Sequence, residues 1–160
     1  MPTTPASLTI ADMLSPKSVK VPLQSTDKQS AIFELVDLLH AGGFIDDPNP
    51  LRAVVWEREQ QRSTGIGEGL AIPHGKCPGM SNLMMAVGRP AAPIQYNSID
   101  RKPVRLIILL ASPPDRTADH IHALGRISRL MSSASFREAA FQTADAESLF
   151  RLLTSGAAGT

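Results

Sequence analysis

Residues 104–111 read V-R-L-I-I-L-L-A and contain the longest apolar run in the chain. After Arg105 the segment has no polar position, so a strand formed here has no face suited to water. Such strands are typical of sheets that helices cover on both faces. Pro113 and Pro114, which cannot continue a central strand, follow almost at once. The segment therefore predicts a buried strand of an α/β protein.

Helical and strand-like segments alternate along the rest of the chain. Apolar residues recur at one-turn spacing within residues 26–42, which predicts a helix. Thr26 or Asp27 can cap its start, and Gly42-Gly43 can end it. Helices interleaved with buried strands predict an α/β layer architecture in a single domain. The predicted strands span residues 70–72, 83–87, 94–96 and 104–111, and the predicted helices span residues 26–42, about 50–64, 117–131, 135–142 and 146–153.

Composition narrows the class of protein. The 160 residues fit one domain, and 42% hydrophobic with 19% charged residues is a globular composition. The net charge is +1 and no basic stripe is interleaved with aromatic residues, so we expect no nucleic-acid partner. With one cysteine, Cys77, and no apolar run of 18 residues, we expect a cytoplasmic protein without internal disulfides or membrane insertion. The polar, proline-bearing residues 1–8 predict a flexible lead-in to a domain over residues 9–155.

The segment most suggestive of chemistry is 58–76, R-E-Q-Q-R-S-T-G-I-G-E-G-L-A-I-P-H-G-K. Pro73 pushes Ile72 toward extended geometry, so we expect a strand to end there and to present His74 just beyond its carboxyl end. Ligand sites of α/β sheets usually lie at such ends. Gly75 would leave the approach to His74 uncrowded, and the glycines within 65–69 could turn backbone amides inward around an anion.

Other chemistries find little support. Gly65-x-Gly67-x-Gly69 matches neither the dinucleotide fingerprint nor a P-loop, which argues against a nucleotide site. A zinc site from His74, His120 and Cys77 lacks the ligand spacings of known zinc motifs. No G-x-S-x-G elbow supports a hydrolase. We therefore expect no cofactor and no metal.

The remaining histidines differ in their predicted surroundings. His40 falls in the last turn of a helix, where a cation suits the helix dipole. His120 and His122 are two residues apart, roughly 200° around a helix, so they cannot share a site. His122 aligns with Arg126 and Arg129 on a solvated face. His120 lies on the inward face in the first turn, where an anion is welcome, and can be either a buried structural histidine or a site residue.

The run T-G-I-G-E-G-L-A-I-P-H-G-K at 64–76 closely resembles the phosphorylation-site signature of enzyme IIA domains of the mannitol/fructose class of the bacterial phosphotransferase system. The resemblance extends over nearly the whole chain. It is carried further by A-D-M-L-S-P-K-S-V at 11–19, K-Q-S-A-I-F-E-L-V-D-L-L at 28–39, I-D-R-K-P-V-R-L-I-I-L-L-A-S-P at 99–113 and D-H-I-H-A-L-G-R-I-S at 119–128.

This resemblance implies a fold and a set of site residues. The implied fold is a single EIIA type-2 domain over residues 9–155, with a mixed, mostly parallel sheet of about five strands flanked by helices. His74 would accept a phosphoryl group from an HPr-type phosphocarrier protein, on Nε2. His120 would support the site, and Arg58 would stabilise the phosphate. The protein would then be a phosphotransferase that passes through a phosphohistidine.

Three classes of function remain open. The P-H-G-K ending of the motif looks most like the nitrogen-related regulatory branch, whose partner would be a regulated target protein. The alternative is a sugar-specific EIIA component that passes phosphate to an EIIB component. A binding module that has lost phosphotransfer is disfavoured by the intact His74, His120 and Arg58. In either of the first two cases, a docking carrier would need an accessible apolar rim around His74. The residues near enough in sequence to contribute to it are Leu70, Met80 and Arg62.

Two positions depart from the family pattern. Arg62 stands where the family often has glycine, and it adds a cation near the expected site. Arg101 stands in a turn where glycine or asparagine is common in the family.

Overall fold

Strand β6 (Leu106–Ser112) is the central strand of a six-stranded mixed sheet, and all seven of its residues are buried. The computed structural model describes residues 8–158 of the chain. The strands run in the order β1-β5-β6-β3-β2, and β4 also pairs with β6. Three of the five pairings are parallel and two are antiparallel. The pairs β1–β5, β3–β6 and β4–β6 are parallel, and β2–β3 and β5–β6 are antiparallel.

Strands β3 (Leu70–Ala71) and β4 (His74–Lys76) are two pieces of one extended segment beside β6. Ala71 pairs with Ile107 and His74 pairs with Leu110, so the register is the same before and after the interruption. Pro73 lies in the gap because it has no N–H to donate, although its carbonyl accepts from the Leu110 amide. The predicted strand does end before Pro73, but His74 does not lie in a loop beyond it: His74 begins β4, the second piece of the same extended segment.

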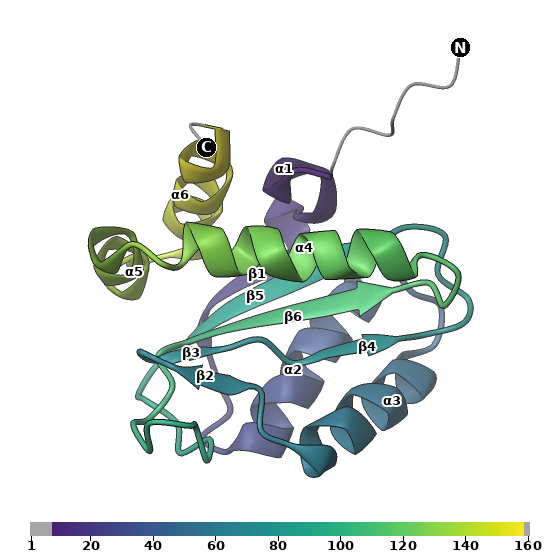
Figure 1. Ribbon diagram of the computed structural model, residues 1–160, viewed down its shortest axis with the longest axis horizontal. Helices are drawn as coiled ribbons and strands as arrows, with labels where there is room; N and C mark the ends of the chain where they lie inside the picture. Colours follow the sequence, from purple (N-terminus) through teal and green to yellow (C-terminus); the bar gives the residue numbers. More distant parts are fainter. Residues whose placement is uncertain (1–7, 159–160) are drawn as a thin grey trace.

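The sheet is the middle layer of three (Figure 1). Residues 106, 108 and 110 of β6 pack into one hydrophobic cluster and residues 107, 109 and 111 into another, as side-chain alternation along a strand requires. The first cluster includes buried residues of α1, α4, α5 and α6, and the second includes those of α2 and α3. The helices are α1 (Ile10–Met13), α2 (Lys28–Ala41), α3 (Pro48–Gln61), α4 (Thr117–Leu130), α5 (Ala134–Phe141) and α6 (Ala146–Ala158), with a 3-10 turn η1 (Pro16–Ser18).

The α/β architecture and the single domain are confirmed, with six strands where about five were expected. All five predicted helices form, and Asp27 is the N-cap of α2, where its side chain accepts from the Ser30 amide. Residues 94–96 do not form a strand, since only Ile94 bridges to Val104. Two edge strands were not predicted, β1 (Val19–Leu23) and β2 (Gly65–Gly67). The remaining strand is β5 (Met84–Pro90).

Two further expectations concern the ends of the chain and the membrane. Of the predicted lead-in, residues 1–7 lie outside the described residues. Within residues 8–158, none of the helices combines the length and the hydropathy needed to cross a bilayer.

Candidate functional site

The ring of His74 is held by a single backbone hydrogen bond. Its Nδ1 lies 2.8 Å from the carbonyl oxygen of Ile72, two residues back along the chain. A carbonyl can only accept, so Nδ1 must carry the hydrogen. In the neutral ring the lone pair is then on Nε2, which leaves that atom as the nucleophile. The His74 side chain is only partly buried, so the nucleophile is within reach of a partner.

His120 reaches the His74 ring from helix α4, which covers one face of the sheet. It occupies the first turn of α4, and the two ring centroids are 5.4 Å apart with an interplanar angle of 62°. His120 is 6% exposed, and its Nδ1 is 2.5 Å from the hydroxyl oxygen of Ser112, the last residue of β6. When that hydroxyl donates to Nδ1, the hydrogen of His120 is on Nε2. The prediction that His120 is on the inward face is confirmed.

The third expected residue, Arg58, lies beside His74 at the edge of a hollow in the surface. It lies in the last turn of α3, where its Nη1 donates to the Arg62 carbonyl at 2.8 Å. His74, Arg58 and Arg62 all line an open hollow of about 270 Å³. The structure thus brings two cations and the exposed edge of a histidine together, an arrangement suited to an anion with several oxygens. The rest of the lining is Ser63, Thr64, Ile66, Ile72, Ile99, Leu124 and Ser128.

The surroundings keep both histidines neutral near pH 7. Burial lowers the pKa of His74, and the Arg58 charge lowers it further, while the Ile72 carbonyl and the Glu59 carboxylate act in the other direction. Burial also lowers the pKa of His120 to about 4, with smaller contributions from the charges that His74 and Lys76 can carry. A neutral His74 has a free lone pair, which is the condition for a nucleophile.

The glycines near His74 have roles other than those expected. A Cβ on Gly75 would lie 3.0 Å from methyl carbons of both Val54 and Val55, so this glycine lets β4 approach α3 and does not clear the path to His74. Gly65 and Gly67 belong to β2, which forms an antiparallel pair with β3. The Gly65 amide donates to the Ser63 hydroxyl, and the Glu68 amide donates to Asp100. The predicted ring of inward-facing amides is therefore replaced by a β-hairpin.

The apolar rim also differs from expectation. Leu70 is 2% exposed and belongs to the core, and Met80 packs against the opposite cluster, so neither lines the hollow. Ile66 and Ile99 do line it, with exposed fractions of 45% and 67%. Ile99 precedes a turn in which Arg101 has φ +64°, a left-handed conformation, in agreement with the glycine or asparagine that the family often has there.

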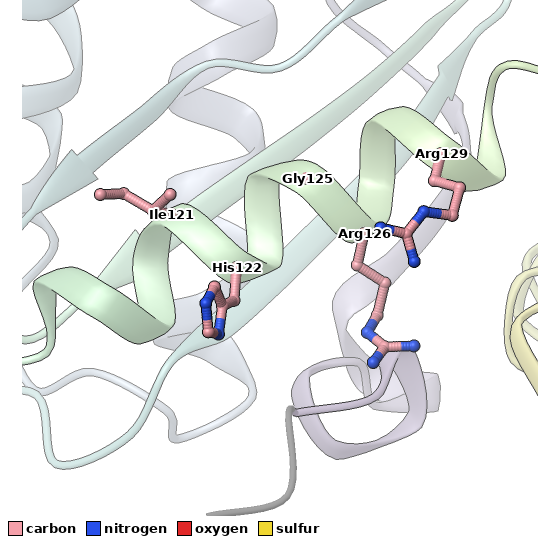
Figure 2. Close-up of a pocket in the computed structure, with 5 residues that line it drawn as sticks. All are labelled: Ile121, His122, Gly125, Arg126 and Arg129. Carbon is pink, nitrogen blue, oxygen red and sulfur yellow. The ribbon is translucent and has the colours of Figure 1, made fainter.

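The other histidines lie apart from this site. His40 is in the last turn of α2, with its Nδ1 3.3 Å from the Ile45 carbonyl. His122 lies on the outward face of α4 with Arg126 and Arg129, where they line a separate hollow of about 290 Å³ (Figure 2). Cys77 is 3% exposed. Among the described residues, no three His, Cys, Asp or Glu side chains gather as a metal site would require.

Three groups of the site were missed from the sequence. The Ile72 carbonyl and the Ser112 hydroxyl orient the two histidines, and only the folded chain brings Ser112 to His120. Glu59, which is 3% exposed, was missed although a signal was present. It falls four residues after Val55, which itself follows Leu51 by four, so all three lie on the buried stripe of α3.

Comparisons with known proteins agree with this geometry. The sequence model of the family described as "Phosphoenolpyruvate-dependent sugar phosphotransferase system, EIIA 2" matches residues 12–156. The nitrogen regulatory protein of Bradyrhizobium diazoefficiens is 31% identical over 90% of this chain and 94% of its own length. The fructose-specific EIIABC component of Bacillus subtilis is 34% identical over 87% of this chain, which spans only 21% of that protein. The crystal structure of nitrogen regulatory protein IIA-Ntr from Neisseria meningitidis superposes with a TM-score of 0.83 at 28% identity, covering 91% of this chain and 99% of that one.

Proposed function

The chain belongs to the phosphotransferase system EIIA type 2 family, and we propose on this basis that it carries a phosphoryl group on Nε2 of His74. The group comes from an HPr-type phosphocarrier protein. The observation that carries the proposal is the hydrogen bond from His74 Nδ1 to the Ile72 carbonyl, because it directs the lone pair of a neutral ring to Nε2. That ring lies at the edge of a hollow lined by Arg58 and Arg62.

The transfer needs positioning more than covalent chemistry from the protein. The Nε2 lone pair of His74 forms a bond to phosphorus, and the donor's N–P bond breaks with its electron pair returning to the donor imidazole. The three phosphoryl oxygens remain on phosphorus, and each ring keeps the hydrogen on its other nitrogen. The phosphorylated His74 ring is then cationic, and the Ile72 carbonyl that accepts from Nδ1–H stabilises it.

The incoming group brings roughly two negative charges, by analogy with other phosphoresidues. Arg58 and Arg62 supply positive charge at the hollow. His120 is neutral near pH 7 and donates a hydrogen bond from Nε2 to a phosphoryl oxygen when Ser112 holds its Nδ1. The exposed Ile66 and Ile99 provide the apolar contact for the docking carrier.

The role that we propose for this phosphoprotein is regulatory, with a target protein that responds to its phosphorylation state. Two of the relatives described above are matched over nearly their whole lengths, and both are nitrogen regulatory proteins. The alternative is a sugar-specific component that passes phosphate to an EIIB protein, and it is supported by the identity to the fructose-specific component. The regulatory role is favoured, because this chain matches 94% of the length of the nitrogen regulatory protein but only 21% of the fructose-specific component.

Phosphate mapping tests the proposal directly. The protein is incubated with phosphoenolpyruvate, an enzyme I-type kinase and an HPr-type carrier, and the acid-labile phosphate is located by mass spectrometry. We expect one phosphate on His74 in the wild type and none in His74→Ala. Full labelling of His74→Ala would refute the assignment, whereas an unlabelled wild type would refute the carrier function itself.

A further inference from the structure

Glu59 is a buried carboxylate that is bonded to three other residues. It is 3% exposed, and its Oε2 lies 2.9 Å from Nζ of Lys28, the first residue of α2. The Thr64 amide donates to Oε2 at 2.7 Å, and the Thr64 and Tyr96 hydroxyls donate to Oε1 at 2.5 and 3.1 Å. A buried charge is tolerated only when it is paired and hydrogen-bonded, as here.

This cluster connects directly to the phosphoryl acceptor. The Thr64 carbonyl accepts from the Ile72 amide at 3.0 Å, and the Ile72 carbonyl accepts from Nδ1 of His74 at 2.8 Å. The backbone of Ile72 is therefore bonded to Thr64 through its amide and to the His74 ring through its carbonyl, which belong to consecutive peptide groups. Hydrogen bonds thus connect Glu59 to Thr64, Thr64 to Ile72, and Ile72 to the His74 ring.

From this series we infer that Glu59 is a positioning residue for phosphoryl transfer, holding Thr64 and Ile72 so that His74 keeps its hydrogen on Nδ1 and offers Nε2. The inference rests on the proposed function of His74. It extends that function to a residue that touches neither the phosphate nor the reacting ring.

The charge of Glu59 acts in the same direction as the geometry. The Glu59 charge favours the cationic His74 ring, and so does the hydrogen bond from Nδ1 to the Ile72 carbonyl, whereas the Arg58 charge disfavours that ring. His120 and His74 also repel one another when both are charged. Glu59 is thus a charged group near His74 that stabilises the cationic ring formed on phosphorylation.

The test removes the charge without leaving its partner unpaired. Glu59→Gln alone leaves the partly buried Lys28 without its counter-ion, so Glu59→Gln is also combined with Lys28→Met, which removes both charges. Glu57→Gln is the matched control, since Glu57 is on the same helix and exposed. The His74 pKa and tautomer are measured by nitrogen-15 NMR of the imidazole, and transfer is measured from a phosphorylated HPr-type carrier.

In the double variant we expect transfer to slow about 10- to 100-fold, as for lost outer partners of metal-bound histidines. We also expect the His74 pKa to fall and the Nδ1–H form to lose population, with Glu57→Gln unchanged. A purely structural role would lower only the unfolding temperature. Wild-type pKa, tautomer and transfer in a folded double variant would overturn the inference.

Two further outcomes are decided by the same measurements. If the Glu59 variants fail to fold, Thr64→Val decides, because it removes one of the two hydrogen bonds by which Glu59 holds Thr64 and removes no charge. There an unchanged tautomer and transfer rate overturn the inference. If the wild type itself takes no phosphate, the proposed function fails, and the NMR comparison still shows whether Glu59 sets the state of the His74 ring.

Discussion

A histidine becomes a directional nucleophile only when one of its nitrogens is occupied. At His74 the occupying group is the carbonyl of Ile72, and the proline between them keeps the two residues extended. At His120 the occupying group is the Ser112 hydroxyl, which comes from a different element. The two rings meet edge to face, each with its Nδ1 engaged, so both Nε2 atoms are left for other partners, which in the proposed function are the phosphoryl group and its oxygens.

His120 and His122 provide a matched pair of substitutions on one helix. In the proposed function, His120→Ala removes a contact to the phosphate, and the loss of one contact to a charged group costs about 1.5–3 kcal/mol, or roughly ten- to 150-fold in rate. His122→Ala should leave transfer unchanged, because His122 is exposed on the outward face of α4 (Figure 2). Single-turnover transfer from the phosphorylated carrier measures both. A silent His120 beside a sensitive His122 would contradict this assignment.

The low pKa of His120 makes the stability of the protein depend on pH. In the folded state this pKa is about 4, against an ordinary value of 6.5, so between these values the unfolded chain binds more protons. The free energy of unfolding therefore rises with pH across this window, by at most about 1.4 kcal/mol per pH unit for one group. The stability gained in this way is lost again as the pH falls toward 4. The lowered pKa of His74 acts in the same direction.

Urea unfolding at several pH values between 4 and 7 measures this dependence. His120→Gln, which cannot titrate, should give a flatter dependence than the wild type. Equal slopes for the two proteins would show that His120 titrates alike in the folded and unfolded states.

At the scale of elements, the strand that carries His74 is held between β6 and α3. Its register with β6 is unchanged across the interruption at Pro73. The missing N–H of Pro73 therefore interrupts the pairing only at that residue. On the α3 side, β4 comes close enough that residue 75 has no room for a side chain. The position of His74 is therefore determined by how closely this strand packs on the helix that carries Arg58 and Glu59.

Gly75→Ala tests that packing. Its Cβ would lie 3.0 Å from methyl carbons of Val54 and Val55 and 3.3 Å from the Val55 amide nitrogen, which cannot move alone. Overpacking of this kind costs about 1–3 kcal/mol in the free energy of unfolding, and it should also slow transfer by displacing His74. Gly125→Ala is the control, because nothing lies within 4 Å of its Cβ and alanine favours a helix by about 0.5–1 kcal/mol. Urea midpoints measure both, and equal midpoints would contradict the close approach.

At the scale of the whole molecule, the site lies where both helical layers meet one strand segment. His120 comes from the α4 layer, whereas Arg58 comes from the α3 layer on the opposite face of the sheet (Figure 1). The hollow at His74 is lined by Arg58 and by Leu124 and Ser128 of α4, and it is bordered by the exposed Ile66 and Ile99. A phosphoryl group added there changes the charge of a surface that a partner protein can contact directly.

We expect the phosphorylated and unphosphorylated proteins to bind different partners through this surface. About two negative charges at His74 should repel acidic partners and attract basic ones, and the difference should fade with salt because exposed charges are screened over ~8 Å at physiological ionic strength. Pull-downs with wild type, His74→Asp and His74→Ala over a range of salt concentrations measure this. Identical partners for all three would favour the sugar-transport alternative over the regulatory role.

Much of this protein was determined by the sequence alone, because the deciding signals are local. An apolar run without a polar face predicts a buried strand, one-turn spacing predicts the helices, and Pro73 next to His74 marks the site. Opposite faces of one helix separate His120 from His122. These inferences depend on neighbours within a few residues, and the fold agrees with those about the strand, the helices and His120, while the site at His74 stays a prediction.

Only the tertiary structure decided which distant groups meet. The short strands β1 and β2 lack a strong pattern of their own, and they form because β5 and β3 supply their hydrogen bonds. Gly75 could be taken for a clear approach to His74 until α3 was seen against it. The Ser112–His120 bond and the Glu59 cluster join residues from separate elements, and the partner of a buried polar group is chosen by packing and not by spacing along the chain.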